Sequence, residues 1–368
     1  MPLTIVHCAD VHLETTFPET RGGGGRRKAL ADAFVRIVDE ALRRGADVLT
    51  IGGDLYESER AGPQTFRFLA EQFARFRKPV FVAPGNHDPY GPGSLFARKD
   101  LPSNVRIFNE ASWRAYPLAA EVTLWGFGHT AGDPGRPFAE ARFERNGTQI
   151  ALVHGSDEAR CPPKKRVTAP FNTSEVVASG ASLLLTGHYH GGYVVSQGGK
   201  PVLAYPGSPE PIKFGEGPGH GALEVRVDGG AIAVRPILIA RTRMVDLDCD
   251  LSGVEHEHGA FERIRPVLAD YGLDDFVRLR LTGNVAEGTR IDRALIEERL
   301  GAALGSLEVN DETHSFDLAS IAREPTVRGH VVRDLLALRR ESDGDAARDA
   351  EWGLRYAVAA FEGTEIAP

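Results

Sequence analysis

Residues 47–56 read Asp-Val-Leu-Thr-Ile-Gly-Gly-Asp-Leu-Tyr, a short apolar run that stops at Gly53 and Asp54. A run of this length that ends in glycines is typical of a buried strand. Residues 3–9 form a similar run that ends at Asp10, and apolar residues recur at helical spacing through residues 30–42. The sequence therefore predicts a strand, a helix and a second strand, which is the repeating unit of parallel sheets.

The pattern continues outward from this unit. Residues 66–73 have helical spacing, and residues 79–83 form a third apolar run. Short strands dominate beyond residue 104, at residues 105–108, 122–126, 149–153, 182–186, 192–196, 202–205, 222–227 and 231–237. We therefore expect an α/β (α+β) fold in which two mixed β-sheets form a sandwich flanked by helices.

The last third of the chain differs from the rest in its predicted order of strands and helices and in its charge. Strands and helices alternate from residue 244 to 304, and helices are predicted at 329–340 and 346–361. Residues 1–240 carry 27 Lys and Arg against 25 Asp and Glu, whereas residues 241–368 carry 16 against 26. We therefore predict a large domain at 1–240, a small α+β capping domain at 241–322 and a helical segment at 323–368. The acidity of residues 241–368 suits contact with protein better than contact with nucleic acid, and an ordinary solvated acidic surface explains it equally well.

Composition narrows the class of protein. The chain has 368 residues, 42% of them hydrophobic, which is enough to bury a full core. Its N-terminus enters a strand at once, and no apolar run reaches ~18 residues, so we expect a soluble, cytoplasmic protein with no membrane contact. The three cysteines are far apart in sequence, which disfavours a disulfide framework and a thiolate zinc site.

Five short polar motifs follow five apolar runs. Each motif begins where a predicted strand ends, and in α/β architectures ligands gather at the carboxyl ends of strands. We therefore expect the five motifs to converge on one site. They are Asp10-Val11-His12, Gly53-Asp54, Gly85-Asn86-His87-Asp88, Val153-His154-Gly155 and Gly187-His188-Tyr189-His190.

The residue types in these motifs favour metal binding. Asp10 and His12 are two residues apart, so in an extended backbone both side chains would face the same way. Asp54 is suited to bridge two ions, because a carboxylate has two oxygens. Carboxylate, imidazole and amide ligands without thiolates suit Mn²⁺, iron or Zn²⁺, and two such ions together can hydrolyse phosphate esters. Any one motif alone is commonplace; their joint occurrence in this order is the signal.

These motifs resemble those of the calcineurin-like metallophosphoesterase superfamily over about the first 210 residues. The segments Ala-Asp-Val-His-Leu, Gly-Asn-His-Asp and Tyr205-Pro-Gly-Ser-Pro look more narrowly like DNA repair exonucleases of the SbcD type, in the YhaO-like branch. The resemblance implies a four-layer sandwich. It also implies one ion held by Asp10, His12, Asp54 and His190, and a second held by Asp54, Asn86, His154 and His188.

The resemblance assigns roles to the remaining residues as well. His87 would contact the phosphate and assist the leaving oxygen, and Mn²⁺ is the metal that the family suggests. We expect Asp88 to hold the tautomer of His87. The family further implies a homodimer that works with an SMC-type (SbcC-like) coiled-coil ATPase, which the apolar stripes in residues 329–361 would contact. An intramolecular helical hairpin explains those stripes equally well.

The leading functional hypothesis is a Mn²⁺-dependent DNA exonuclease or endonuclease acting in DNA repair or DNA-end processing. A small-molecule phosphodiesterase on the same scaffold is the nearest alternative, and a non-catalytic scaffold subunit is the second. The hundred residues beyond the sandwich favour the nuclease. Basic residues in two predicted loops are candidates for DNA contact: Arg21, Arg26, Arg27 and Lys28 in a glycine-rich flexible loop, and Lys164, Lys165 and Arg166 in another.

Overall fold

A computed structural model describes residues 2–16, 23–132, 134–143, 146–161, 166–217, 219–286, 289–315 and 318–362. The chain divides into two compact units, Met1–Arg243 and Met244–Pro368. The division lies three residues beyond the predicted boundary at 240, and the second unit includes both the predicted cap and the terminal helices. No helix among the described residues has the length and apolar character that a membrane span requires.

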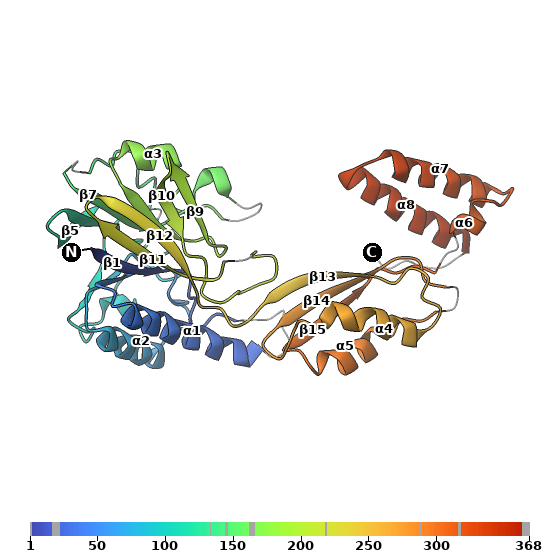
Figure 1. Ribbon diagram of the computed structural model, residues 1–368, viewed down its shortest axis with the longest axis horizontal. Helices are drawn as coiled ribbons and strands as arrows, with labels where there is room; N and C mark the ends of the chain where they lie inside the picture. Colours follow the sequence, from blue (N-terminus) through green and yellow to red (C-terminus); the bar gives the residue numbers. More distant parts are fainter. Residues whose placement is uncertain are drawn as a thin grey trace. The chain divides into compact units, whose positions relative to one another are not determined.

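The first unit contains two six-stranded mixed sheets (Figure 1). In the first sheet, three parallel pairings join β1 to β4 in chain order, and two antiparallel strands extend the sheet beyond β1. Its spatial order is β12 (Ala231–Leu238), β11 (Gly221–Asp228), β1 (Leu3–Cys8), β2 (Val48–Ile51), β3 (Val80–Val82) and β4 (Val105–Ile107).

The second sheet has a parallel centre and one antiparallel strand at each edge. Its order is β5 (Arg114–Ala119), β6 (Val122–Phe127), β7 (Thr148–His154), β8 (Leu183–Gly187), β10 (Lys200–Tyr205) and β9 (Tyr193–Gln197). Strand β5 was not predicted, because the pattern of Arg114 to Ala119 exposes alternate residues and contains a proline. Two 3₁₀ turns, η1 (Leu95–Ala97) and η2 (Glu158–Arg160), lie in the connections.

Helices cover the outer face of each sheet, which confirms the predicted sandwich. Helices α1 (Gly23–Arg43) and α2 (Pro63–Phe76) pack on the first sheet, and α3 (Thr173–Ala178) packs on the second (Figure 1). Between the sheets, alternate residues of both, such as Ile5 and Leu152, form a third apolar layer. Phe73 of α2 is buried in the core between this helix and the first sheet. Phe66 is also buried, under the guanidinium of Arg98.

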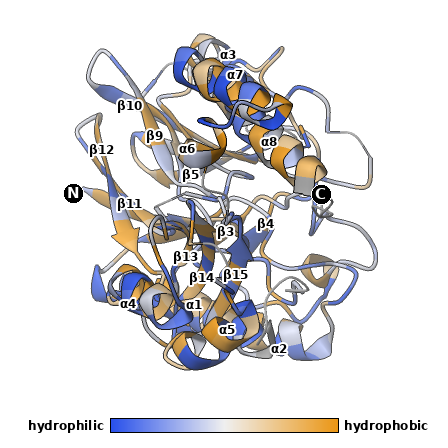
Figure 2. Ribbon diagram, turned by 90° about the vertical axis from the view of Figure 1, so that its right-hand side faces the viewer, coloured by the Kyte–Doolittle hydropathy of each residue, from blue (hydrophilic) through white to orange (hydrophobic). Residues whose placement is uncertain are grey.

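The second unit contains a parallel three-stranded sheet of β13 (Met244–Asp250), β14 (Phe276–Thr282) and β15 (Ser306–Asp311). Helices α4 (Glu257–Leu268) and α5 (Arg293–Gly301) share its apolar core. Helices α6 (Leu318–Ile321), α7 (Val327–Glu341) and α8 (Gly344–Glu362) form a smaller cluster around Val332, Leu354 and Val358. Figure 2 shows hydrophilic and hydrophobic residues interspersed along α7 and α8.

One sequence prediction about the backbone is wrong. We expected residues 21–28 to form a flexible loop, but α1 already begins at Gly23. Buried contacts of Arg26 hold this first turn: its side chain is 2% exposed and donates to the hydroxyl of Thr242 at 2.7 Å and to the carbonyl of Pro211. Residues 21 and 22 lie outside the described residues.

His7, the last residue but one of β1, joins the two sheets. Its Nδ1 lies 3.0 Å from the Thr50 hydroxyl in β2, and its Nε2 lies 3.2 Å from the Thr186 carbonyl in β8. Complete burial lowers the pKa of His7 to about 4, although hydrogen bonds to Thr186 and Thr50 oppose the shift. His7 is therefore neutral in the folded protein at neutral pH and serves the fold.

Replacing His7 with Gln should flatten the acid side of the stability profile. The unfolded chain binds a proton at His7 near pH 6.5, whereas the folded chain does so only near pH 4. Stability from this residue is therefore complete above pH 6.5 and falls by up to about 1.4 kcal/mol per pH unit between these values. Urea unfolding of metal-free wild type and His7→Gln at pH 7, 6 and 5 would measure the difference, and parallel profiles would contradict it.

Candidate metal centre

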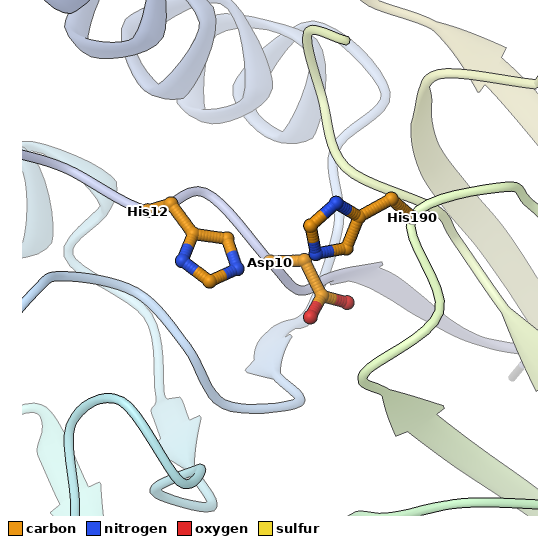
Figure 3. A group of neighbouring side chains, drawn as sticks. All are labelled: Asp10, His12 and His190. Atoms are coloured by element: carbon orange, nitrogen blue, oxygen red, sulfur yellow. The ribbon is translucent and has the colours of Figure 1, made fainter. Parts of the chain in front are cut away.

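The five sequence motifs lie at the carboxyl ends of five central strands. Asp10 and His12 follow β1, Asp54 follows β2, and Asn86 and His87 follow β3. In the second sheet, His154 is the last residue of β7, and His188 and His190 follow β8. Figure 3 shows Asp10, His12 and His190 turned toward one another although they come from different sheets. The sandwich therefore brings all the predicted ligands to one edge of the two sheets.

Four of the predicted ligands have an uncommon backbone conformation. Asp10, His12, Asp54 and His188 have positive φ angles of 53°, 50°, 50° and 108°. Asp10 and His12 therefore do not share an extended backbone, and that part of our sequence argument is wrong. The segment instead follows the loop after β2, with the Asp10 N–H donating to Gly53 O at 3.0 Å and the His12 N–H to Asp54 O at 2.9 Å. Residues with positive φ angles other than glycine are strained, and they cluster at functional sites.

The ligand atoms form two groups around Asp54. Asp10, His12 and His190 form one group, and Asp54, His154 and His188 form the other, with ligand atoms within 4.8 Å of one another in each; His12 also lies in a group of the same spacing with Glu57 and His87. Asp54 Oδ2 lies 3.8 Å from His12 Nε2 and 3.2 Å from His154 Nε2, so a single oxygen lies between the groups. Asn86 Oδ1 lies 3.1 Å from His154 Nε2. The arrangement is that of two ion sites that share one carboxylate.

Hydrogen bonds on the outer side of each imidazole decide which nitrogen faces the centre. Nδ1 of His12 donates to Glu57 at 2.8 Å, that of His154 to the Gly52 carbonyl at 2.8 Å, and that of His190 to Glu216 at 2.5 Å. His188 is reversed, because its Nε2 donates to the Arg166 carbonyl at 2.8 Å. Such outer partners fix the tautomer and orientation of metal-binding histidines.

The chemistry of the inner atoms fits a pair of cations. His12 Nε2 is buried and has no hydrogen-bond partner, which is costly unless the atom binds an ion. Burial opposes ionisation of Asp54, yet the charge of His154 holds its pKa well below the ordinary value. Burial likewise opposes protonation of His154, but Asp54 raises the pKa of that imidazole to about 9. The buried carboxylate therefore demands positive charge beside it, from protons or from metal ions.

Glycine at position 85 lets Asp54 reach this place. A side-chain Cβ there would lie 2.3 Å from Asp54 Oδ1 and 2.7 Å from the Asp54 nitrogen. Such a contact is far too short, so any larger residue at this position would displace the shared carboxylate. The glycine of the Gly-Asn-His-Asp motif is thus explained by close approach rather than by a turn.

Glu57 is the functional residue that sequence reasoning missed. Its two oxygens accept hydrogen bonds from His12 Nδ1 and from His87 Nδ1, both at 2.8 Å. Burial raises the pKa of Glu57, but these two hydrogen bonds outweigh it and bring the pKa down to about 2. The bond to Glu57 in turn raises the pKa of His87. One carboxylate therefore holds both a predicted metal ligand and the predicted phosphate-contacting histidine.

The role expected for Asp88 is wrong for the same reason. Asp88 is fully buried, and its carboxylate accepts backbone hydrogen bonds from Asp54, Leu55 and Gly85 at 3.1, 2.6 and 2.6 Å. It braces the loops after β2 and β3 against each other and does not hold the tautomer of His87, since Glu57 does. Burial and the charge of Asp54 raise the pKa of Asp88 to about 6.

Glu216 is a second residue that the motifs did not reveal. It lies 26 residues beyond His190, in the long connection between β10 and β11, and its side chain is 3% exposed. Burial lowers the pKa of His190 and thereby keeps this imidazole neutral, as a metal ligand must be, although Glu216 opposes the shift. No local sequence pattern marks Glu216, because only the fold brings it to His190.

The basic candidates for DNA contact differ in their exposure to solvent. Arg27, Lys28 and Arg166 are exposed, and Lys28 pairs with Asp32 at 2.5 Å. Lys164 and Lys165 lie outside the described residues, as does Arg21. Arg26 is wrong as a DNA contact, because its guanidinium is buried and committed to Thr242 and Pro211.

Comparisons with known proteins agree with this geometry. The calcineurin-like phosphoesterase family matches residues 3–192. The chain is 30% identical to the metallophosphoesterase YhaO of Bacillus subtilis over 254 residues, which are 63% of this chain and 59% of that protein. It is 24% identical to the DNA double-strand break repair protein Mre11 of Methanopyrus kandleri over 363 residues, 89% of this chain and 77% of that protein.

Among solved structures, a dimetal phosphatase from Danio rerio is similar at 12% identity with a TM-score of 0.44, over 63% of this chain and 95% of that one. The chain spans less than two thirds of the length of YhaO.

Replacing Glu57 with Gln should weaken metal binding and any reaction at the site together. An amide cannot accept from both imidazoles with the charge of a carboxylate, so His12 and His87 lose their fixed orientation. Loss of such an outer partner typically costs about 10- to 100-fold in metal affinity or activity. Metal titration by calorimetry would measure the first effect. Glu59→Gln, an exposed neighbour, is the matched control, and equal affinities in both variants would contradict the role.

Proposed function

Because the chain belongs to the calcineurin-like phosphoesterase family, we propose that its two-ion site hydrolyses phosphodiester bonds of DNA, as an exonuclease or endonuclease in repair or end processing. One observation carries the proposal. The buried carboxylate of Asp54 lies between two groups of ligand atoms, 3.8 Å from His12 Nε2 and 3.2 Å from His154 Nε2, and an outer hydrogen bond orients each of the four imidazoles in these groups.

We propose Asp10, His12, Asp54 and His190 as the holders of one ion, and Asp54, Asn86, His154 and His188 as the holders of the other. Oxygen and imidazole ligands without thiolate suit Mn²⁺, which is the ion we propose. A pair of such ions activates a water molecule and neutralises the charge of the scissile phosphate. The second group is fully buried, so the substrate approaches from the side of His87, whose side chain is 43% exposed.

His87 is the proposed proton donor. Its Nδ1 is occupied by Glu57, which leaves Nε2 to face the substrate. In the proposed reaction the oxygen of a water molecule bonds to phosphorus as the bond from phosphorus to the leaving oxygen breaks. The leaving oxygen keeps the electron pair and takes the proton from Nε2, the attacking water releases its surplus proton to solvent, and solvent reprotonates His87.

Two features support DNA as the substrate over a small phosphodiester. The similarity to Mre11, a protein named for double-strand break repair, extends over 89% of this chain and so includes the second unit. The first unit also has the more basic sequence, since 29 Lys and Arg face 25 Asp and Glu in residues 1–243, whereas 14 face 26 in residues 244–368. Phosphate contact therefore belongs on the first unit.

The same similarity supports a protein partner for the second unit. We propose that helices α7 and α8 dock on an SMC-type coiled-coil ATPase and that the protein acts as a homodimer. The two helices pack on each other through Val332 and Leu354, yet Leu338, Tyr356 and Phe361 remain about half exposed. The hairpin alternative thus explains part of the apolar stripe and leaves a part that fits a partner helix.

Purified protein supplied with Mn²⁺ should cleave linear DNA, and EDTA should abolish the cleavage. The metal-dependent step requires both ion groups, so activity should return only when the divalent ion is restored. Gel analysis of end-labelled duplex and single-stranded DNA measures the products. If the protein hydrolyses bis-p-nitrophenyl phosphate but leaves both DNA forms intact, it is a small-molecule phosphodiesterase instead.

Replacing His87 and Asp54 with Ala should separate catalysis from metal binding. His87→Ala should lower kcat about 10²- to 10⁴-fold while the protein still binds its metal, because His87 is not among the residues proposed to hold either ion. Asp54→Ala should lose bound metal as well, because the shared carboxylate is gone. Elemental analysis and kcat measure the two effects, with His330→Ala, an exposed histidine of α7, as control. Full activity in either site variant would overturn the assignment.

A further inference from the structure

A buried arginine gathers three separate segments of the first unit. Arg26, in the first turn of α1, donates to the Pro211 carbonyl in the loop after β10 and to the Thr242 hydroxyl beyond β12. Glu210 lies 4.0 Å from the Arg26 guanidinium and is 1% exposed. Residues near 26, 211 and 242 therefore meet at one place on the unit although they are far apart in sequence.

Glu210 strengthens this junction from the inside. Its carboxylate pairs with Arg36 at 2.5 Å and accepts the backbone N–H groups of Arg241 and Thr242 at 3.0 and 3.1 Å. A buried carboxylate that accepts hydrogen bonds from three donors and lies beside a fourth cationic group is satisfied within the fold and cannot serve the surface. These contacts therefore hold the backbone next to the neighbouring exposed side chains in place.

Three exposed cations flank the junction: Arg27 next to Arg26, Lys213 two residues after Pro211, and Arg241 next to Thr242. Within the described parts of the chain, none of these three side chains has an ion pair or hydrogen bond, unlike Lys28 with Asp32. We call Arg27, Lys213 and Arg241 the junction cations. An ion-paired arginine has its charge neutralised, whereas these three present it to solvent.

The same loop leads directly to the ion site. Glu216, three residues after Lys213, accepts the Ile212 N–H at 2.7 Å and the His190 Nδ1–H at 2.5 Å. Both carboxylates of this loop, Glu210 and Glu216, are turned inward and buried, while Lys213 is turned outward. The loop therefore offers positive charge to solvent on one side and holds a metal ligand on the other.

We propose that the junction cations are a phosphate-contacting surface that seats the backbone of DNA beside the loop of His190. The proposal rests on the proposed nuclease function and deepens it, since it names where the polyanionic substrate meets the first unit. Three exposed cations that neighbour one buried junction suit contact with phosphates and contribute affinity without reading sequence. A small phosphodiester, which carries a single negative charge, would gain little from them.

The test is the salt dependence of DNA binding. The triple variant Arg27→Gln, Lys213→Gln, Arg241→Gln should lower the slope of log K against log salt by about 0.9 for each lost contact, and binding at 50 mM salt should weaken at least about tenfold. Fluorescence anisotropy of a labelled duplex with the metal-loaded protein measures both. An unchanged metal content shows that the site of the variant is intact.

Two further variants make the result specific. Arg67→Gln, Arg77→Gln, Lys200→Gln removes the same charge from exposed positions on α2, its end and the start of β10, and should bind DNA like wild type. The exchange Arg27→Lys, Lys213→Arg, Arg241→Lys keeps the charges and should also bind like wild type. If the junction variant keeps the wild-type slope and affinity, or the control loses as much, the surface proposal is overturned while the nuclease proposal stands. If wild type itself neither binds nor cleaves DNA, both fall.

Discussion

The buried charge of Asp54 is the constraint from which the rest of the site follows. A carboxylate removed from water must be surrounded by donors or cations, and here it lies against His12, His154 and the His87 backbone N–H. Glu57 orients His12, and the Gly52 carbonyl orients His154. Gly85 has no side chain that would displace the Asp54 carboxylate. The two sheets are consequently locked in a relative position, because the donors come from the ends of strands in both.

Sequence patterns predicted what depends on local order and missed what depends on the fold. Strand ends marked by Asp10-Val-His12 or Gly-His-Tyr-His190 could be recognised, because each polar motif interrupts an apolar run, and the family comparisons confirm the resemblance drawn from them. Glu57 lay three residues from Asp54 and could have been suspected as a nearby acid. Glu216 and the buried state of Arg26 could not, since their partners are 26 and more than 180 residues away. The tautomer assignment to Asp88 failed because adjacency in sequence was taken for contact.

The two units differ in charge in a way that suits the two roles proposed for them. The first unit holds every proposed metal ligand together with the junction cations, and its net charge is positive. The second contains no lysine and carries almost two acids for each arginine. Polyanions are repelled by such a surface, whereas basic or apolar protein surfaces are not. The proposed phosphate contacts on the first unit and the proposed protein contact on the second are thus suited to oppositely charged surfaces.

The left-handed backbone at Asp10, His12, Asp54 and His188 has a consequence for laboratory evolution. Each of these residues has a positive φ angle, which glycine adopts at lower free energy, so four positions of the proposed site are places where a change to glycine could relieve backbone strain. A selection for heat resistance alone would favour such changes and empty the site of its ligands. Screens for a more heat-stable variant of this protein therefore need metal retention as a second criterion, because thermal stability and metal binding favour different residues at these four positions.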